Sequence, residues 1–178
     1  DYTYLNEMNK KINIFGKKFV ENNKENCYLK INEKELKLTD EYQLEEQNKP
    51  ELIIHLIQEK PIENMSEMFK ECRCLSSILI KQQWLMSKIN DMSSMFFECN
   101  NLKHFNGSYL DTSEVKNFSK MFCNCKSLKK DKDFNVDFNT ESAENLKEMF
   151  YGCESLEKAN NNDKNKGISN WETKNVII

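Results

Sequence analysis

Glycine, histidine and arginine are scarce in this chain of 178 residues, and each scarcity argues against a class of function. Four glycines are too few for a glycine-rich loop that cradles a phosphate group with its backbone amides. The two histidines offer few general bases, and neither accompanies a strained nucleophile turn. Arg73 is the single arginine, so the chain has almost none of the side chain best suited to bidentate hydrogen bonding with guanine or phosphate.

Long apolar runs and a targeting segment are missing as well. No stretch approaches the roughly 18 apolar residues that a membrane-spanning helix needs, and the first residues do not resemble a signal peptide. The formal charge of −3 argues against an overall polyanion binder. We therefore expect no membrane insertion, and we favour an intracellular location, with the cell surface as the alternative.

What the sequence does contain is a repeat. The dipeptide Met-Phe begins at Met68, Met95, Met121 and Met149, which are 27, 26 and 28 residues apart. The blocks around it align without gaps as NMSEMFKECRCL, DMSSMFFECNNL, NFSKMFCNCKSL and NLKEMFYGCESL. A block of this length cannot bury its own apolar face, so the copies are expected to stack. Val176, preceded by Trp171 and Thr173, looks like the start of a fifth copy.

Stacking predicts buried columns of equivalent side chains, spaced about 4.8 Å apart like neighbouring strands. The columns expected inside the protein are Met65/Met92/Phe118/Leu146, Met68/Met95/Met121/Met149, Phe69/Phe96/Phe122/Phe150, Cys72/Cys99/Cys125/Cys153 and Leu75/Leu102/Leu128/Leu156.

The repeat resembles the BspA-like leucine-rich repeats, in the Met-Phe-x-x-Cys-x-x-Leu variant found in bacterial surface antigens and protist proteins. The resemblance covers about residues 60–178. It implies a β-rich repeat solenoid of the leucine-rich-repeat type, with short parallel strands and short helical or 3-10 turns. That family places core residues three, six and eight positions after the cysteine, as Leu75, Ile78 and Ile80 follow Cys72. The third and fourth copies depart from this spacing, so their strands are expected to be short or irregular.

The front of the chain lacks the block. We interpret residues 1–60 as a small β-rich N-terminal cap, and residues 61–178 as the solenoid, with four repeats and the start of a fifth. A separate small β domain with its own partner is the alternative for the front third. Residues 12–15 predict a strand before Gly16 and a short helix, and residues 28–38 predict a hairpin. The run 52–57 predicts a strand that forms the first rung of the solenoid.

The seven cysteines allow three interpretations. Zinc is disfavoured because Cys72-x-Cys74 and Cys123-x-Cys125 have the wrong spacing and lie two coils, or about 10 Å, apart. Neighbouring column cysteines could form disulfides, since Cα atoms about 5 Å apart are within reach of such a bond. Buried thiols that act as small hydrophobic groups are the favoured interpretation, and we expect no metal or other cofactor.

The positions between the expected core residues give the sharpest functional indication, because they should project together from one face. The middle of this predicted strip is basic although the chain is acidic. One interpretation is a solvated lysine face that keeps the sheet soluble. The functional hypothesis is a docking strip for an acidic protein surface, and an RNA backbone is a weaker possibility. The strip comprises Lys103, His104, Asn106, Lys129, Lys130, Lys132, Glu157, Lys158 and Asn160.

These observations favour a non-catalytic protein–protein interaction module that serves as a structural subunit or scaffold within a larger assembly. A cell-surface adhesin or antigen, as the resemblance implies, is the alternative. An enzyme is a distant third. The sequence Asn106-Gly107-Ser108 is also a candidate glycosylation site if the protein is secreted.

Overall fold

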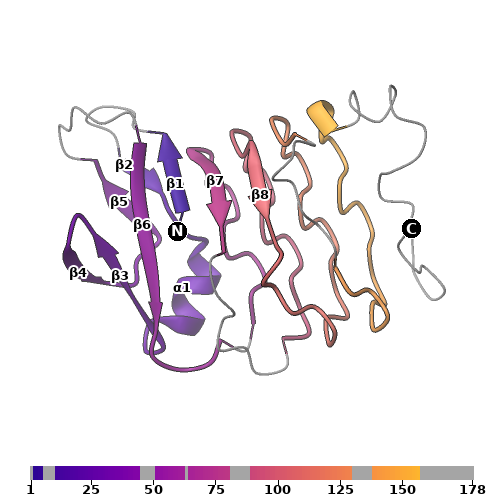
Figure 1. The fold of residues 1–178 in the computed structure, drawn as a ribbon, viewed down its shortest axis with the longest axis horizontal. Coiled ribbons are helices and arrows are strands. Elements are labelled where there is room, and N and C mark those ends of the chain that lie inside the picture. The colour runs from indigo at the N-terminus through magenta and orange to yellow at the C-terminus, as the bar shows by residue number, and fades with distance from the viewer. Residues whose placement is uncertain are drawn as a thin grey trace.

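The computed structural model describes residues 2–5, 11–44, 51–62, 64–80, 89–129 and 138–156 (Figure 1). Within these ranges, one mixed sheet of six strands has the order β4-β3-β6-β1-β7-β8, and a second sheet pairs β2 with β5. The elements are β1 (Tyr2–Leu5), β2 (Lys11–Asn13), α1 (Lys17–Asn23), β3 (Cys27–Ile31), β4 (Lys34–Lys37), β5 (Glu41–Gln43), β6 (Glu51–Gln58), β7 (Leu75–Leu79) and β8 (His104–Asn106).

The short helix and the hairpin predicted for the front third are confirmed, and the strand predicted over residues 12–15 is observed at Lys11–Asn13. Strand β2 is followed by Gly16 and by α1, which buries Phe19. Strands β3 and β4 form the expected hairpin, and its turn residues Asn32 and Glu33 have φ angles of 49° and 63°. Two left-handed residues in succession are typical of the tight turn whose twist matches that of the flanking strands.

The fold class expected from the sequence is wrong. A leucine-rich-repeat solenoid behind a separate cap would place β6 beside β7 as the first parallel rung. Instead, β1 lies between β6 and β7 and pairs antiparallel with both, so one sheet joins the front of the chain to the repeats. Among the described strands only β7 and β8 pair in parallel, and the third and fourth copies contribute isolated bridges rather than strands. The structure is therefore a small β-rich protein with two sheets.

The repeat copies nevertheless lie over one another, as their matched positions predict. Phe69, Phe96, Phe122 and Phe150 form a row of parallel rings whose neighbouring centroids are 5.4, 5.0 and 5.2 Å apart. Every member of the five predicted columns is buried, except Leu146 and Phe150 in the last copy, which are half-buried. The prediction of stacked, dry columns is confirmed, and Figure 1 shows the successive copies following β7 and β8.

Backbone hydrogen bonds explain how such short blocks stack. In the first copy, the N–H groups of Met65, Glu67, Phe69 and Glu71 donate to carbonyls of the second copy over 3.3, 3.0, 2.8 and 2.7 Å. The N–H groups of Met68, Lys70 and Cys72 instead donate to carbonyls three residues earlier in the same copy. Hydrogen bonds to the next copy and hydrogen bonds within the copy therefore alternate along the backbone. This geometry uses left-handed residues just before each Met-Phe and two positions after it. These residues are Glu67, Ser94, Lys120 and Glu148, and Glu71, Glu98, Asn124 and Gly152.

The Asn or Asp that opens each block has a structural role. Its side-chain oxygen accepts a hydrogen bond from the backbone N–H two residues later, over 2.7, 2.8, 3.1 and 3.0 Å in the four copies. Asn and Asp are suited to this turn because their short side chains reach their own backbone. The four residues are Asn64, Asp91, Asn117 and Asn145.

The front third packs tightly on the first copy, so the two share one core. The rings of Tyr2 and Phe15 lie 4.9 and 5.2 Å from that of Phe69. The Gly16 N–H donates to the Met68 carbonyl over 2.8 Å, and a Cβ atom at Gly16 would collide with the backbone of Glu67. Glycine is therefore required at this contact because the two backbones touch.

Candidate interaction face

The six-stranded sheet buries one side and leaves the other facing solvent. Successive side chains of a strand point to opposite sides, so alternate residues define the two faces. Tyr4, Leu29, Ile54, Ile78 and Phe105 point into the core and are at most 3% exposed. We call the opposite side the outer sheet face. It comprises Thr3, Tyr28, Lys30, Ile53, His55, Ile57, Ser77, Leu79, His104 and Asn106.

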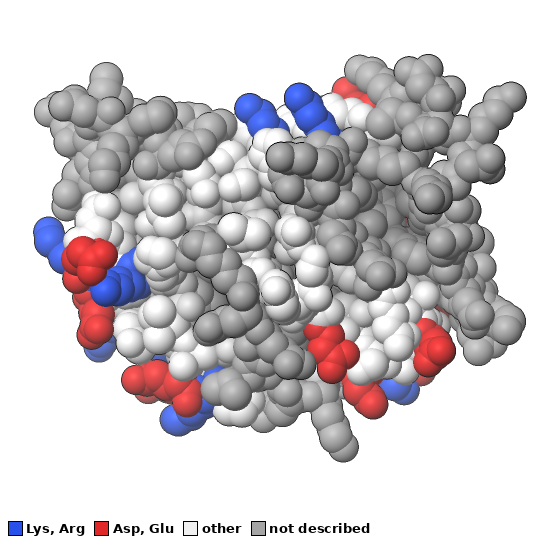
Figure 2. Space-filling view, viewed as in Figure 1, with Lys and Arg blue, Asp and Glu red and all other residues white. Residues whose placement is uncertain are grey.

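The centre of the outer sheet face is uncharged and partly apolar. Thr3 of β1 pairs with Ile53 on one side and with Ser77 on the other. Ile53 on β6 and Leu79 on β7 are large aliphatic side chains of this face, and they are 50% and 44% exposed. Among the residues coloured in Figure 2, the charged side chains lie mainly at the margins of this view.

A shallow groove crosses the face between β7 and β8. Its volume is about 330 Å³, and it is lined by Ser77, Ile78, Leu79, His104, Phe105 and Asn106. In the parallel register of the two strands, Ser77 lies opposite His104, and Leu79 lies opposite Asn106. The groove thus combines an apolar side chain with three polar side chains that can donate or accept hydrogen bonds. Because it is open to solvent, it suits a side chain of a partner protein better than an enclosed small molecule.

The structure describes four of the nine residues of the predicted strip. His104 and Asn106 lie on the outer sheet face, and Lys103 and Lys129 are exposed just before and beside β8. The two lysines belong to neighbouring copies, and their backbones lie side by side because the Lys129 N–H donates to the Lys103 carbonyl over 3.2 Å. The other five residues lie outside the described ranges, namely Lys130, Lys132, Glu157, Lys158 and Asn160.

Sequence reasoning missed the apolar part of the face. The run 52–57 is almost continuously apolar, so its period did not reveal that Ile53 points outward while Leu52 and Ile54 are buried. Thr3 was missed because β1 was not recognised as a strand. Its short alternation of aromatic and polar residues, from Tyr2 to Tyr4, is the signal that could have indicated one.

The cysteine column is structural rather than reactive. The thiols of Cys99, Cys125 and Cys153 donate to the carbonyls of Phe69, Phe96 and Phe122 over 2.9, 3.1 and 3.0 Å. In each case the acceptor belongs to the preceding copy, so the thiols add a second set of bonds between copies.

Burial raises the pKa of the Cys72, Cys99 and Cys125 thiols well above the ordinary value, because a thiolate would be desolvated there. A reactive cysteine needs the opposite environment, one that stabilises the thiolate. All seven cysteines lie in described segments and are thiols rather than disulfides.

A second cleft, of about 530 Å³, lies where α1 meets the first copy, but its charges are largely balanced. Glu67 pairs there with Lys70 at 3.2 Å and with Lys18 at 3.8 Å. Within the described ranges, no group of three or more His, Cys, Asp and Glu side chains is arranged to hold a metal ion. No helix in the same ranges is long and apolar enough to cross a membrane.

Within the described ranges, the fold is that of a β-rich protein whose mixed sheet ends on two strands from the first two of four stacked repeat copies. A family described as "Mycoplasma protein of unknown function, DUF285" matches residues 63–178, a range that contains all four Met-Phe dipeptides. The chain belongs to this family. No curated protein and no solved structure matches the chain.

Proposed function

We propose that the protein is a non-catalytic interaction module that holds a partner protein against the outer sheet face. The observation that supports this proposal is the exposure of Ile53 and Leu79 on a sheet face whose described central residues, Thr3, Ile53 and Ser77, are not ionisable. The centre of a protein–protein interface is depleted of charged residues, and its rim is polar. The described part of the outer sheet face has this distribution, since its charged side chains lie toward the margins of the view in Figure 2.

Rigidity of the sheet favours the same function. Neighbouring strands in the order β3-β6-β1-β7-β8 are hydrogen-bonded to each other, and the row of stacked phenylalanines lies inside the repeats. A surface fixed in this way loses little conformational freedom on binding, so more of the contact energy appears as affinity.

The chemistry of the margin suggests which partners fit. Lys103 and Lys129 stand together at the start of β8, with the uncharged groove directly beyond them. A partner with an apolar segment and a neighbouring acidic group would be complementary to this end of the face. An RNA backbone would use the lysines but would gain little from Ile53 and Leu79, so we favour a protein.

The proposed role is that of a structural subunit or scaffold inside the cell. The seven thiols support this location, since disulfides persist mainly in proteins of oxidising compartments. The resemblance to BspA-like repeats is the reason to keep a surface adhesin as the alternative. An interaction module is compatible with either location.

Photo-crosslinking tests the proposal. A photoreactive residue at position 53 or 79 should capture the same partner in cells of the source organism, whereas the same residue at Tyr151 should not. Tyr151 is the matched control because it is also large and 67% exposed, but it lies on a turn of the last copy.

The captured partner then allows a quantitative test. Leu79→Lys should weaken its affinity by about 1.5–3 kcal/mol, the value of burying one such side chain, or roughly tenfold to more than a hundredfold. Tyr151→Lys should leave the affinity unchanged. Equal affinities for Leu79→Lys and the parent protein would contradict the proposed face, provided that both variants show the parent's circular dichroism.

A further inference from the structure

Asn106 and Gly107 form the only Asn-Gly pair in the sequence, and they lie at the end of β8. The Asn106 side-chain carbonyl oxygen accepts two hydrogen bonds from Ser108, one from its N–H over 3.0 Å and one from its hydroxyl over 2.6 Å. Asn106 is half-buried, so water reaches it. The Gly107 N–H donates to no residue within the described ranges, because the strand pairing stops at Asn106.

The repeat offers a comparison that isolates these features. Asn117 has the same two donors, the N–H of Ser119 at 3.1 Å and its hydroxyl at 2.8 Å. The next residue is Phe118, however, and its N–H donates to the Asn145 carbonyl over 2.8 Å. Asn117 thus has the same contacts on its oxygen but a bulky successor whose amide is engaged. Asn106 combines the two donors with a small successor whose amide is not engaged.

We propose that Asn106 is a site of spontaneous deamidation. The Gly107 amide nitrogen attacks the side-chain Cγ atom of Asn106, and a new bond forms between them. The bond from Cγ to the side-chain nitrogen breaks, and the amide proton of Gly107 leaves with that nitrogen as ammonia. Water then adds to one of the two carbonyls of the cyclic imide and opens it to aspartate or isoaspartate at position 106.

The two donors assist this step for a physical reason. Negative charge develops on the side-chain oxygen as the nitrogen attacks, and donors already aimed at that oxygen stabilise the charge without reorganising. Glycine at position 107 permits the attack because it has no side chain to obstruct the approach. The position does not accept a larger residue easily, since a Cβ atom there would lie 2.9 Å from the Phe105 ring and 3.1 Å from the Phe138 ring.

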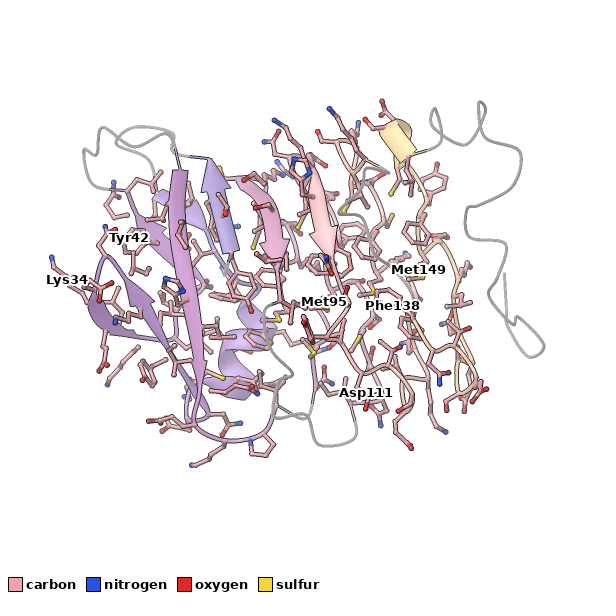
Figure 3. The ribbon with its side chains drawn as sticks, viewed as in Figure 1. Lys34, Tyr42, Met95, Asp111, Phe138 and Met149 are labelled. Carbon is pink, nitrogen blue, oxygen red and sulfur yellow. The ribbon has the colours of Figure 1, made fainter. Side chains whose placement is uncertain are left out.

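The product would change the outer sheet face. Either product adds a negative charge two residues from His104, in the wall of the groove between β7 and β8. Isoaspartate also lengthens the backbone by one carbon where Gly107 is packed between two rings (Phe138 is labelled in Figure 3). The deamidation itself does not depend on the proposed function, because it needs only the local geometry.

Mass spectrometry of proteolytic peptides tests the proposal on the full chain, aged in mildly alkaline buffer. The peptide with Asn106 should gain one mass unit and split into two isomers, while the peptide with Asn117 stays unchanged. Ser108→Ala should slow the reaction about tenfold, less than the effect of a buried oxyanion donor in an enzyme because this site is half-exposed. Ser108→Thr keeps the hydroxyl and should keep the rate, and Asn106→Gln should abolish the change.

Two results would overturn the proposal. The first is an Asn106 peptide that converts no faster than the Asn117 peptide in the folded protein. The second is an equal rate for the folded chain and the same chain unfolded in urea, because the contacts with Ser108 would then contribute nothing.

Discussion

The row of stacked phenylalanines allows a graded test of the repeat core. Phe122 is fully buried, and its ring centroid lies 5.0, 5.1 and 5.2 Å from those of Phe96, Phe105 and Phe150. Phe150 occupies the same position in the last copy, where it is half-buried. The substitution of leucine at either position keeps an apolar side chain but removes the ring faces, so the pair of variants compares one change in two environments.

The structure sets the expected sizes. Each aromatic pair contributes about 0.5–1.5 kcal/mol beyond its buried area, and Phe122 takes part in three such pairs that share its ring. Adding the cost of a partly filled cavity, Phe122→Leu should lower the free energy of unfolding by about 2–4 kcal/mol. Phe150→Leu should lower it by about 1 kcal/mol, because part of its surface is already in contact with water.

Urea denaturation followed by circular dichroism measures both free energies of unfolding. A typical domain is stable by only about 5–15 kcal/mol, so the two expected losses are large enough to separate. The slope of the free energy against urea should stay the same if both variants keep the native fold. Equal losses for the two variants, or a loss at Phe122 below that at Phe150, would refute the interpretation of the row as one continuous buried core.

Three further predictions concern the junction, the thiols and the surface. Gly16→Ala should destabilise the protein by about 1–3 kcal/mol in the same urea assay, because the added methyl group meets the Glu67 carbonyl; an unchanged midpoint would contradict that contact. Burial raises the pKa of Cys27 to about 11, whereas an unfolded thiol titrates near about 8.5, so its contribution to stability is full below the lower value and is lost as pH rises toward the higher one. Cys27→Ser should reduce this alkaline loss, and an identical pH profile would count against it. Lys116→Gln, which breaks the exposed pair with Glu144 at 2.8 Å, should leave the midpoint of urea unfolding unchanged, because solvent screens the pair; a clear fall in the midpoint would mean that surface pairs hold the copies together.

The repeat core could be predicted because identical spacing leaves stacking as the way to bury short apolar faces. The order of strands could not, because the partner of a strand depends on residues far away in the sequence. Strand β6 reads as a neighbour of the first repeat, yet β1 takes that place and reverses the pairing. Four residues, Tyr2–Leu5, therefore decided the fold class. Their alternation is too short to reveal a central strand.

The candidate site shows the same division. His104 and Asn106 were predicted from their positions between core residues, and their place on the outer sheet face follows from the alternation in β8. Ile53 was not predicted, because a continuous apolar run does not show which side faces water. The contact of Lys103 and Lys129 with a partner stays a prediction.

By itself, the sequence determined the repeat, its buried columns and the turn chemistry of each block, because these depend on contacts between residues at a fixed spacing. The tertiary structure decided which strands meet, where the front of the chain packs and which apolar side chains are left facing water. Pairing in a sheet is set by the whole set of surfaces that must be covered at once, and no local pattern contains that information.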